Sequence, residues 1–500
     1  MKHFLFRVDL GLFLFSHRLY RQPSGFSQQY NIIIHTMSIS LYKEAGYGED
    51  PNEERSVGLD RVEKVWADWR RRQKNSSSKS TLLFFNIHLD RLAVDFLLKQ
   101  RLEDDQSITK IHLVECTYRD NEVIDSLFDF MNQIAGHRLQ ELMVADSDSD
   151  TEFFIRSHFL NHLLGSVHKL PSLRALSVSC VQLDEAATRC LKNLLALDTC
   201  HIRELRLWGC HKSDGALHEL VQGIRHHQAG LTFLDLERWQ LTDQELVLVS
   251  NAVMDSPTKD TLQSLDCSNN PLQSESMSTL TRVLKECIHL RSLIVWSCEH
   301  LFAPYEGEDL AERQHFHDAF ESFLDELRRN VSLTELNISH CGMNGQVLGP
   351  LFRALEANET VQALDVRSTS PISVKTIQDS LPRLRGVADL GIAFYPEEQQ
   401  ALYDVLKKNT SITEVYGTSF DGGFFVSQDK NMHALFRRNK FLKKVPCYVK
   451  EIQRDGVTEE TKSLWPLCLR QMMGREWTRN QDLSAAFYFL KAVSGDLVAA

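Results

Sequence analysis

The sequence predicts an α/β solenoid in which a parallel β-sheet lines a concave side and α-helices line the convex side. Two observations predict it. A short pattern of apolar residues recurs from about residue 80 to residue 448, and the segments between its copies have helical periodicity. A single unit of this kind cannot bury its own apolar face, so the units must stack into one continuous array.

The repeat places apolar residues at positions 0, 3 and 5 of each copy, often with Asn or Cys at position 8. The clearest copy consists of Leu262, Leu265, Cys267, Asn270 and Leu272. Twelve copies are recognised, and they begin at Leu82, Ile108, Leu139, Leu173, Ile202, Leu231, Leu262, Leu290, Leu333, Val361, Val387 and Ile412. We expect positions 0, 3, 5 and 8 to face the core, which also accounts for Cys116, Cys210, Trp239, Cys298 and Cys341.

The spacing of the copies leaves room for a helix after each strand. The copies that begin at 173, 202, 231, 262 and 290 are 29, 29, 31 and 28 residues apart. Residues 243–253 are predicted to be helical, with Thr242 and Glu245 as a capping box. The step from 290 to 333 is 43 residues long and indicates an insertion around 299–312. This insertion is interpreted either as an acidic contact arm or as a surface loop.

The ends of the chain differ from the repeats. Residues 1–60 are predicted to be a flexible leader, either a targeting segment or sequence upstream of a true start at Met37. Residues 61–79 are assigned as a short helix with Trp66 and Trp69, followed by a linker. Residues 80–448 form the solenoid, and 449–500 are predicted to be a helical C-terminal cap.

Composition excludes several classes of function. The formal net charge is −11, and an acidic body repels the phosphates of nucleic acid and of anionic membranes. No apolar stretch is long enough for an ordinary transmembrane helix. Eleven cysteines without a CxxC pair argue against a disulfide framework and a zinc ribbon. We therefore expect a cytoplasmic monomer, although the leader leaves organelle targeting open. Five Asn-x-Ser/Thr patterns are interpreted as chance occurrences, at Asn75, Asn330, Asn337, Asn358 and Asn409.

The repeat resembles the ribonuclease-inhibitor-like subclass of leucine-rich repeat proteins, over roughly three quarters of the chain. This group includes the sensor regions of NOD-like receptors and the Ran GTPase-activating proteins. The resemblance implies a horseshoe that binds proteins. The chain departs from a complete NOD-like receptor because it has no P-loop, and from the Ran activators because a mixed helical segment replaces their acidic tail.

No motif for enzymatic chemistry is present. P-loop, GxGxxG, GxSxG and HExxH patterns are all missing from the sequence. His158 and His162 have metal-compatible spacing on a predicted helix, but no carboxylate base lies between them. His226 and His227 are interpreted as a solvated helix end. We therefore predict no catalytic residue, no cofactor and no metal.

The binding surface is predicted from positions 2, 4, 6 and 7, which should point out of the concave sheet. The predicted partner-binding residues are Glu204, Arg206, Trp208, Phe233, Asp235, Glu237, Asp266, Trp296, Asn337 and Arg367. Tryptophan and arginine often anchor interfaces, and the carboxylates should select a basic partner. The alternative is that the aromatic side chains pack on their neighbours, or are covered by the leader or by the 299–312 segment.

The function predicted from these observations is a non-enzymatic scaffold or adaptor that binds a protein partner, whose identity the sequence does not give. A regulator of a small GTPase and a ubiquitin-ligase substrate receptor are the alternatives, although no recognisable F-box precedes the repeats. An enzyme or a structural element of unknown type is a third class.

Overall fold

The computed structural model describes residues 57–75, 81–100, 108–135, 138–146, 157–304, 310–367, 373–394, 399–416, 432 and 435–440. The chain divides into two compact units, Met1–Leu301 and Phe302–Ala500. The predicted C-terminal cap at 449–500 and most of the predicted leader lie outside the described residues.

Parallel strands form in every one of the twelve predicted copies. In the first unit they pair in chain order: β1 (Thr81–Phe85), β3 (Lys110–Val114), β5 (Glu141–Ala145), β6 (Ala175–Ser179), β8 (Glu204–Arg206), β10 (Phe233–Asp235), β11 (Ser264–Asp266) and β12 (Ser292–Ile294). In the second unit the order is β13 (Glu335–Asn337), β14 (Ala363–Asp365), β15 (Asp389–Gly391) and β16 (Glu414–Tyr416). Four shorter strands form two parallel pairs beside this sheet, β2 (His88–Leu89) with β4 (Thr117–Tyr118), and β7 (Gln182–Leu183) with β9 (His211–Lys212).

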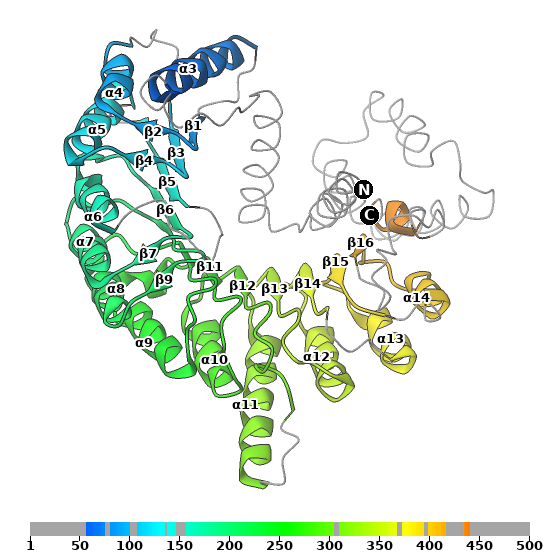
Figure 1. The fold of residues 1–500 in the computed structure, drawn as a ribbon. Coiled ribbons are helices and arrows are strands. Elements are labelled where there is room, and N and C mark those ends of the chain that lie inside the picture. The colour runs from blue at the N-terminus through cyan, green and yellow to red at the C-terminus, as the bar shows by residue number, and fades with distance from the viewer. Residues whose placement is uncertain are drawn as a thin grey trace, which may run out of the picture. The chain divides into compact units, whose positions relative to one another are not determined.

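Helices follow the strands and lie together on one side of the sheet in each unit (Figure 1). In the first unit they are α4 (Arg91–Leu98), α5 (Asn121–Ala135), α6 (Ser157–Ser166), α7 (Glu185–Leu195), α8 (Ala216–His226), α9 (Asp243–Met254) and α10 (Ser276–Glu286). The helix α3 (Val57–Asn75) instead precedes β1 and lies at that end of the array. In the second they are α11 (Leu310–Arg329), α12 (Gly345–Ala357), α13 (Val374–Ser380) and α14 (Gln399–Leu406). The predicted α/β solenoid is confirmed. None of the described helices combines the length and apolar composition needed to span a bilayer.

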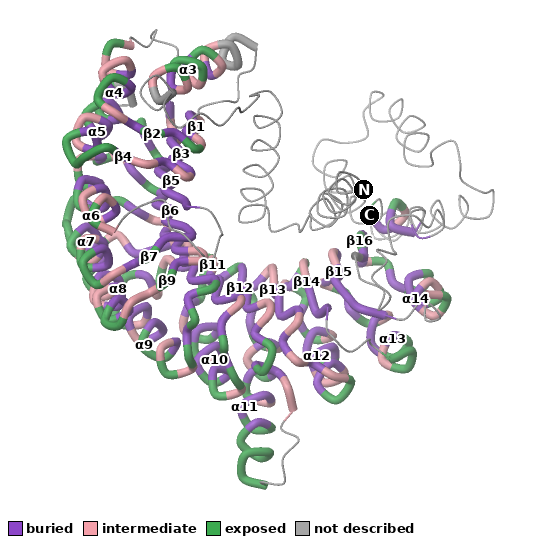
Figure 2. The backbone as a smooth tube through the Cα atoms, viewed as in Figure 1, coloured by how far each residue is buried: buried purple, intermediate pink, exposed green. Residues whose placement is uncertain are grey.

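The core lies between the strands and the helices, as positions 0, 3 and 5 predict. Leu231, Leu234 and Leu236 are fully buried, and Figure 2 shows that exposure concentrates on the outer sides of the helices. One register in the sequence reading was wrong. Leu82 pairs with Ile111, which stands at position 3 of its copy, so Leu82 also occupies position 3 rather than the start.

Position 8 connects five of the copies to the one before. In these copies its side chain donates a hydrogen bond to the carbonyl at position 5 of the preceding strand. Trp239 Nε1 lies 2.6 Å from the Leu207 carbonyl oxygen, and Asn270 Nδ2 lies 3.0 Å from that of Leu236. The thiols of Cys210 and Cys298 make longer contacts of the same kind, at 3.2 and 3.6 Å. These side chains therefore satisfy the buried carbonyls that neighbouring strands leave unpaired.

In eight copies, the residue at position 7 has a positive φ and therefore left-handed backbone geometry. These residues are Asn86, Glu115, Cys180, Gly209, Arg238, Asn269, Ser297 and His340. This conformation turns the chain away from the strand and brings the position-8 side chain back into the core. It is strained for residues with a Cβ atom, by about 1–2 kcal/mol. Stacking of the copies must therefore impose it.

A second set of polar side chains holds the opposite ends of the strands in the second unit. The amide nitrogen of Asn358 donates to the carbonyls of Leu327 and Asn330, at 2.7 and 2.9 Å, and its oxygen accepts the Thr360 and Val361 amides. Asn409 makes the equivalent contacts two copies later. Its amide nitrogen donates to the carbonyls of Leu381 and Leu384, and its oxygen accepts the amides of Ser411 and Ile412.

These contacts correct the chance interpretation of three Asn-x-Ser/Thr patterns. Asn330, Asn358 and Asn409 are buried, and the hydroxyl at the third position of each pattern donates to the Asn oxygen. The pattern is therefore a turn motif of the fold. His227 has the same role in the first unit. It is fully buried, with its ring nitrogens 3.0 and 2.7 Å from the carbonyls of Leu195 and Ile202. The prediction that His227 is solvated was wrong.

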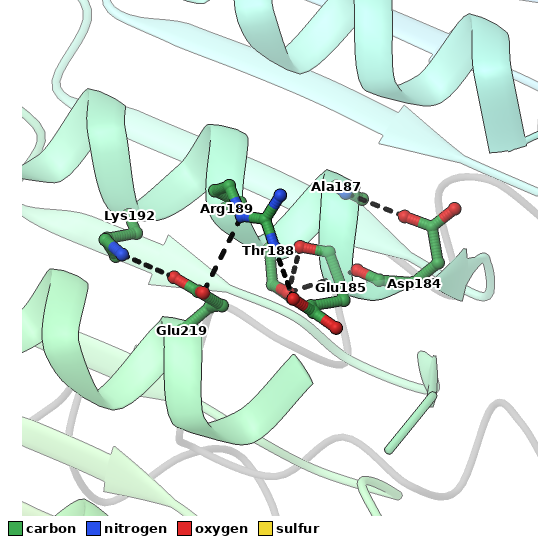
Figure 3. Close-up of polar contacts among 7 residues, drawn as sticks. All are labelled: Asp184, Glu185, Ala187, Thr188, Arg189, Lys192 and Glu219. Carbon is green, nitrogen blue, oxygen red and sulfur yellow. Dashed lines mark hydrogen bonds and ion pairs between the residues drawn. The ribbon is translucent and has the colours of Figure 1, made fainter. Parts of the chain in front are cut away.

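Ion pairs connect neighbouring helices on the outer side. Figure 3 shows Lys192 and Arg189 of α7 approaching the Glu219 carboxylate of α8, at 2.6 and 3.7 Å. The hydrogen bond from Lys192 lowers the pKa of Glu219. Asp184 caps α7 by accepting the Ala187 amide at 2.7 Å. Such partly exposed pairs contribute little individually, so packing remains the main force between helices.

The predicted capping box of α9 is present. The Thr242 amide donates to the Glu245 carboxylate, and the Thr242 hydroxyl accepts the Glu245 amide. The helix predicted around Trp66 and Trp69 is α3, which packs against α4 and β1 with both indoles buried. The histidine pair on α6 is not brought to a common ligand, because His162 contacts Asp125 at 3.0 Å and His158 is exposed.

The predicted insertion is only partly a surface segment. Leu301 and Phe302 are fully buried, and residues 305–309 lie outside the described residues. Phe302 packs on Phe320 and Phe323 of α11, a helix of 20 residues that takes up much of the extra length. The two buried residues therefore belong to the core and are not part of a contact arm.

We predict that Asn270→Ala lowers the free energy of unfolding by about 2–4 kcal/mol. The substitution leaves the Leu241 amide and the carbonyls of Leu236, Cys267 and Ser268 without their partner. Cys298→Ala is the matched control at position 8 and should cost only about 1 kcal/mol, since it removes weak thiol contacts. Urea unfolding followed by circular dichroism measures both. Equal losses would show that the hydrogen bonds of Asn270 add no stability.

Candidate functional site

The face of the sheet that is turned away from the helices is called here the inner face. In the first unit, the strand register arranges positions 2, 4 and 6 of consecutive copies in three rows across this face. Position 2 gives Glu204, Phe233, Ser264 and Ser292, and position 4 gives Arg206, Asp235, Asp266 and Ile294. Position 6 gives Trp208, Glu237, Ser268 and Trp296. Eight of the ten predicted partner-binding residues therefore lie together on one surface.

Three carboxylates converge at the centre of these rows. Asp235 and Asp266 stand directly opposite each other on β10 and β11, and Glu237 follows Asp235 by two residues. One oxygen of each carboxylate lies within 4.8 Å of the others, and all three residues are buried. We call Asp235, Glu237 and Asp266 the acidic trio. In the described part of the chain, it is the group whose geometry suits a metal ion.

The pKa values of all three carboxyls of the trio are raised. Burial raises the pKa of Asp235 to about 6. Burial and the neighbouring Asp235 raise the pKa of Glu237 to about 7, although hydrogen bonds from the side chains of Trp208 and Asn269 oppose the shift. Burial, Asp235 and Glu237 raise the pKa of Asp266 well above its usual range. Burial raises all three pKa values, and repulsion between like charges adds to the shifts of Glu237 and Asp266.

The position-4 residues also have a structural role that the sequence reading missed. In four copies an Asp or Asn oxygen accepts the backbone amide two residues later, where the strand ends. The residues are Asp235, Asp266, Asn337 and Asp365, with donor distances of 2.9, 2.9, 3.1 and 3.1 Å. The signal was present in the sequence, since each of these residues follows the position-3 leucine. Part of the acidity of this face therefore arises from strand termination.

The aromatic residues of the site are only partly buried. Trp208, Phe233 and Trp296 all retain solvent exposure. The Arg206 guanidinium lies over the Phe233 ring at 4.9 Å and forms an ion pair with Glu204. Arg238 lies over the Trp208 ring at 5.7 Å. Cations stacked on these rings hold them in fixed orientations, while part of each ring stays accessible.

The last two predicted residues lie in the second unit. Arg367 and Asp365 are both buried, and the guanidinium contacts both oxygens of the Asp365 carboxylate, with the shortest distance 2.6 Å. Asn337 pairs in register with Asp365 on the neighbouring strand. Arg367 therefore uses its charge within the fold.

Exposure differs from the expectation for six of the ten residues. Arg206, Asp235, Glu237, Asp266, Asn337 and Arg367 are buried, whereas Glu204, Trp208, Phe233 and Trp296 remain partly exposed. The reason is geometric, since side chains in one row are only about 4.8 Å apart from strand to strand and cover one another. The role of the ten residues in partner binding stays a prediction.

The inner face of the first strands carries an apolar cluster that was not predicted from the sequence. Val114, Met143 and Ala145 are buried there, and the partly buried Leu83 and Phe85 pack against them. A polar group lies on the same strands, because the Glu141 carboxylate contacts Lys110 at 2.6 Å and His112 at 3.0 Å.

We predict that Asp266→Asn raises the free energy of unfolding by about 1–2 kcal/mol at pH 8 in buffer with a chelator. Asparagine keeps the acceptor for the Ser268 amide and removes one of three buried like charges. Asp365→Asn is the matched control and should lower stability, because it breaks the buried pair with Arg367. Chemical denaturation measures both. A loss of stability in Asp266→Asn would contradict the repulsion argument.

Comparisons with known proteins give distant likenesses. No protein-family model matches the chain. The Tonsoku-like protein of Bos taurus is 29% identical over 161 residues, which cover 32% of this chain and 11% of that protein. The match therefore spans about a tenth of that relative's length.

Among solved structures, the leucine-rich repeat-containing protein LegL7 from Legionella pneumophila is 12% identical with a TM-score of 0.36, covering 71% of this chain and 96% of that one. A chain of the yeast Rad7 and Elc1 complex is 13% identical with a TM-score of 0.37, covering 81% and 96%. The leiomodin-1 actin-binding site 2 is 16% identical with a TM-score of 0.24, covering 28% and 82%.

The fold assignment rests on the chain itself. Its copies share core positions, and several share a position-8 hydrogen bond to the preceding strand and a left-handed residue at position 7. The ribonuclease-inhibitor-like subclass stays a prediction. The repeated pattern and the stacked strand–helix units that it forms give this chain the fold of leucine-rich repeat proteins.

Proposed function

We propose that the chain is a non-enzymatic scaffold that binds a protein partner on the inner face of its first unit. The observation that supports this proposal most is the pair of partly exposed tryptophans in the position-6 row. Trp208 and Trp296 stand at the two ends of the row, with Glu237 and Ser268 between them. Each ring can still bury apolar area against another molecule, which is typical of interface anchors.

The spacing of the tryptophans limits what fits between them. Trp208 follows β8 and Trp296 follows β12, three strand spacings apart, which is about 14 Å. A helix with its side chains is about 10–12 Å wide. A single helix or one extended segment of the partner therefore suits this row, with Phe233 as a third anchor in the row of position 2.

Charge supports a partner with a basic surface. The acidic trio is too buried for most partner side chains to reach, but its charge still contributes to the potential above the face. Glu204 is partly exposed and lies on the same face, in the row of position 2. Such a potential raises the rate of encounter with basic proteins more than it raises affinity.

We predict that a Trp208→Ala, Trp296→Ala double variant recovers its specific partner at least 10-fold less than the wild type in affinity capture with mass-spectrometric identification. Val247→Ala, Leu248→Ala on α9 is the matched control, since it removes two exposed apolar side chains from the outer side. Control and wild type should recover the partner equally, and all proteins are compared at equal thermal stability.

The identity of the recovered protein distinguishes the alternatives. A small GTPase, followed by a change in its hydrolysis rate, would support the regulator function. A subunit of a ubiquitin ligase would support the substrate-receptor function. Undiminished recovery of the same partner by the double variant would contradict binding through the tryptophans.

A further inference from the structure

The acidic trio places three carboxyl groups where water cannot screen a charge. Asp235, Glu237 and Asp266 are 2%, 7% and 1% exposed. Taking several carboxylates out of water is costly unless a cation accompanies them. Their oxygens nevertheless converge from two strands to within 4.8 Å of one another, rather than turning away from each other. This convergence is the arrangement that an oxygen-liganded cation requires.

A fourth oxygen points to the same place. Ser268 lies beside Glu237 in the position-6 row and two residues after Asp266 on the same face. Its side chain is fully buried and lies close enough to Asp266 to lower the pKa of that carboxyl, yet its hydroxyl has no partner at hydrogen-bond geometry within the described residues. Buried hydroxyls are normally satisfied, so an oxygen left in this way beside three carboxylates indicates a missing ligand.

The inner face of the first unit carries more carboxylates than guanidinium groups. The three rows and the adjoining position 7 carry four carboxylates, those of Glu204 and the trio, against the two guanidinium groups of Arg206 and Arg238. With all four carboxylates ionised, the difference is two negative charges. Arg206 already contacts Glu204 and the Phe233 ring. A divalent cation would bring the group to neutrality.

Ligand type and burial favour calcium. The four candidate ligand atoms are all oxygens, which hard cations prefer and which zinc and copper do not. Mg²⁺ usually keeps several of its bound waters, whereas Ca²⁺ takes more oxygens from the protein in a flexible geometry. The trio is buried, which leaves little room for bound water and therefore favours Ca²⁺.

We propose that the acidic trio and the Ser268 hydroxyl form a binding site for a divalent cation of the size and hardness of Ca²⁺, between β10 and β11. A basic side chain of a protein partner is the competing ligand, but the trio is covered almost completely and admits a small ion more easily than an ammonium group on a long stem. The ion would join two adjacent repeats in the middle of the inner face. The proposal does not depend on whether that face binds a partner.

We predict that the full chain, freed of metal by a chelator, binds one Ca²⁺ by isothermal titration calorimetry and gains thermal stability as Ca²⁺ is added. Asp266→Asn and Glu237→Gln should each weaken Ca²⁺ affinity at least 10-fold, because each removes a charged ligand and keeps the side-chain shape. Mg²⁺ should bind more weakly than Ca²⁺.

Asp365→Asn is the matched control for the loss of a carboxylate. It neutralises a buried position-4 carboxylate in the second unit that also accepts a backbone amide, and it should leave Ca²⁺ affinity unchanged within twofold. Tb³⁺ provides an independent readout. Its emission should be sensitised by tryptophan in the wild type, because Trp208 hydrogen bonds to Glu237, and lost in Asp266→Asn.

Two results would overturn the cation site. The first is the absence of Ca²⁺ binding at millimolar concentration in folded wild type. The second is equal affinity in the wild type, Asp266→Asn and Glu237→Gln. If one variant fails to fold, the other still tests the site. No partner protein is present in these titrations, so their failure is distinguishable from failure of the tryptophan capture experiment.

Discussion

The fold depends on hydrogen bonds and apolar contacts that pass from each repeat to the one before it. A strand of three residues cannot be stable alone, and its leucines have nothing to pack on within their own copy. Hydrogen bonds from position-8 side chains join such strands to the preceding copy. Trp239 and Asn270 reach back to carbonyls that would otherwise be buried without a donor. Each of these copies therefore supplies hydrogen-bond donors to the copy before it, and this contact fixes the register between their strands.

This dependence constrains the surface as well as the core. The strands bring position-4 side chains opposite one another at the strand spacing, whether or not their charges agree. Asp235 and Asp266 are consequently opposed on β10 and β11. Each also accepts a backbone amide where its strand ends, which gives an aspartate at that position a structural use. Repulsion between them is the consequence of repeating a good strand terminator in adjacent copies.

The repeat could be predicted from the sequence because its apolar residues recur at fixed positions in each copy. All twelve copies form strands, and the capping box of α9 is present where Thr242 and Glu245 indicated it. Errors arose where one copy lacks the full pattern, as at Leu82, which was taken as the start of its copy although it stands at position 3. The role of His227 was also missed, because a polar residue at a helix end looks solvated until the carbonyls of Leu195 and Ile202 are known to lie beside it.

The extent to which residues of the inner face are buried could not be predicted from the sequence. Periodicity tells which side of a strand a residue faces, but not how far its neighbours on other strands cover it. Arg206 illustrates the difference. It alternates with core leucines as a surface residue should, yet Glu204 and the Phe233 ring enclose it. Trp208 and Trp296 remain partly exposed because their side chains are larger than those of Glu237 and Ser268, which lie between them in the same row. The inner face thus combines an enclosed acidic centre with aromatic edges, and each part suits a different ligand.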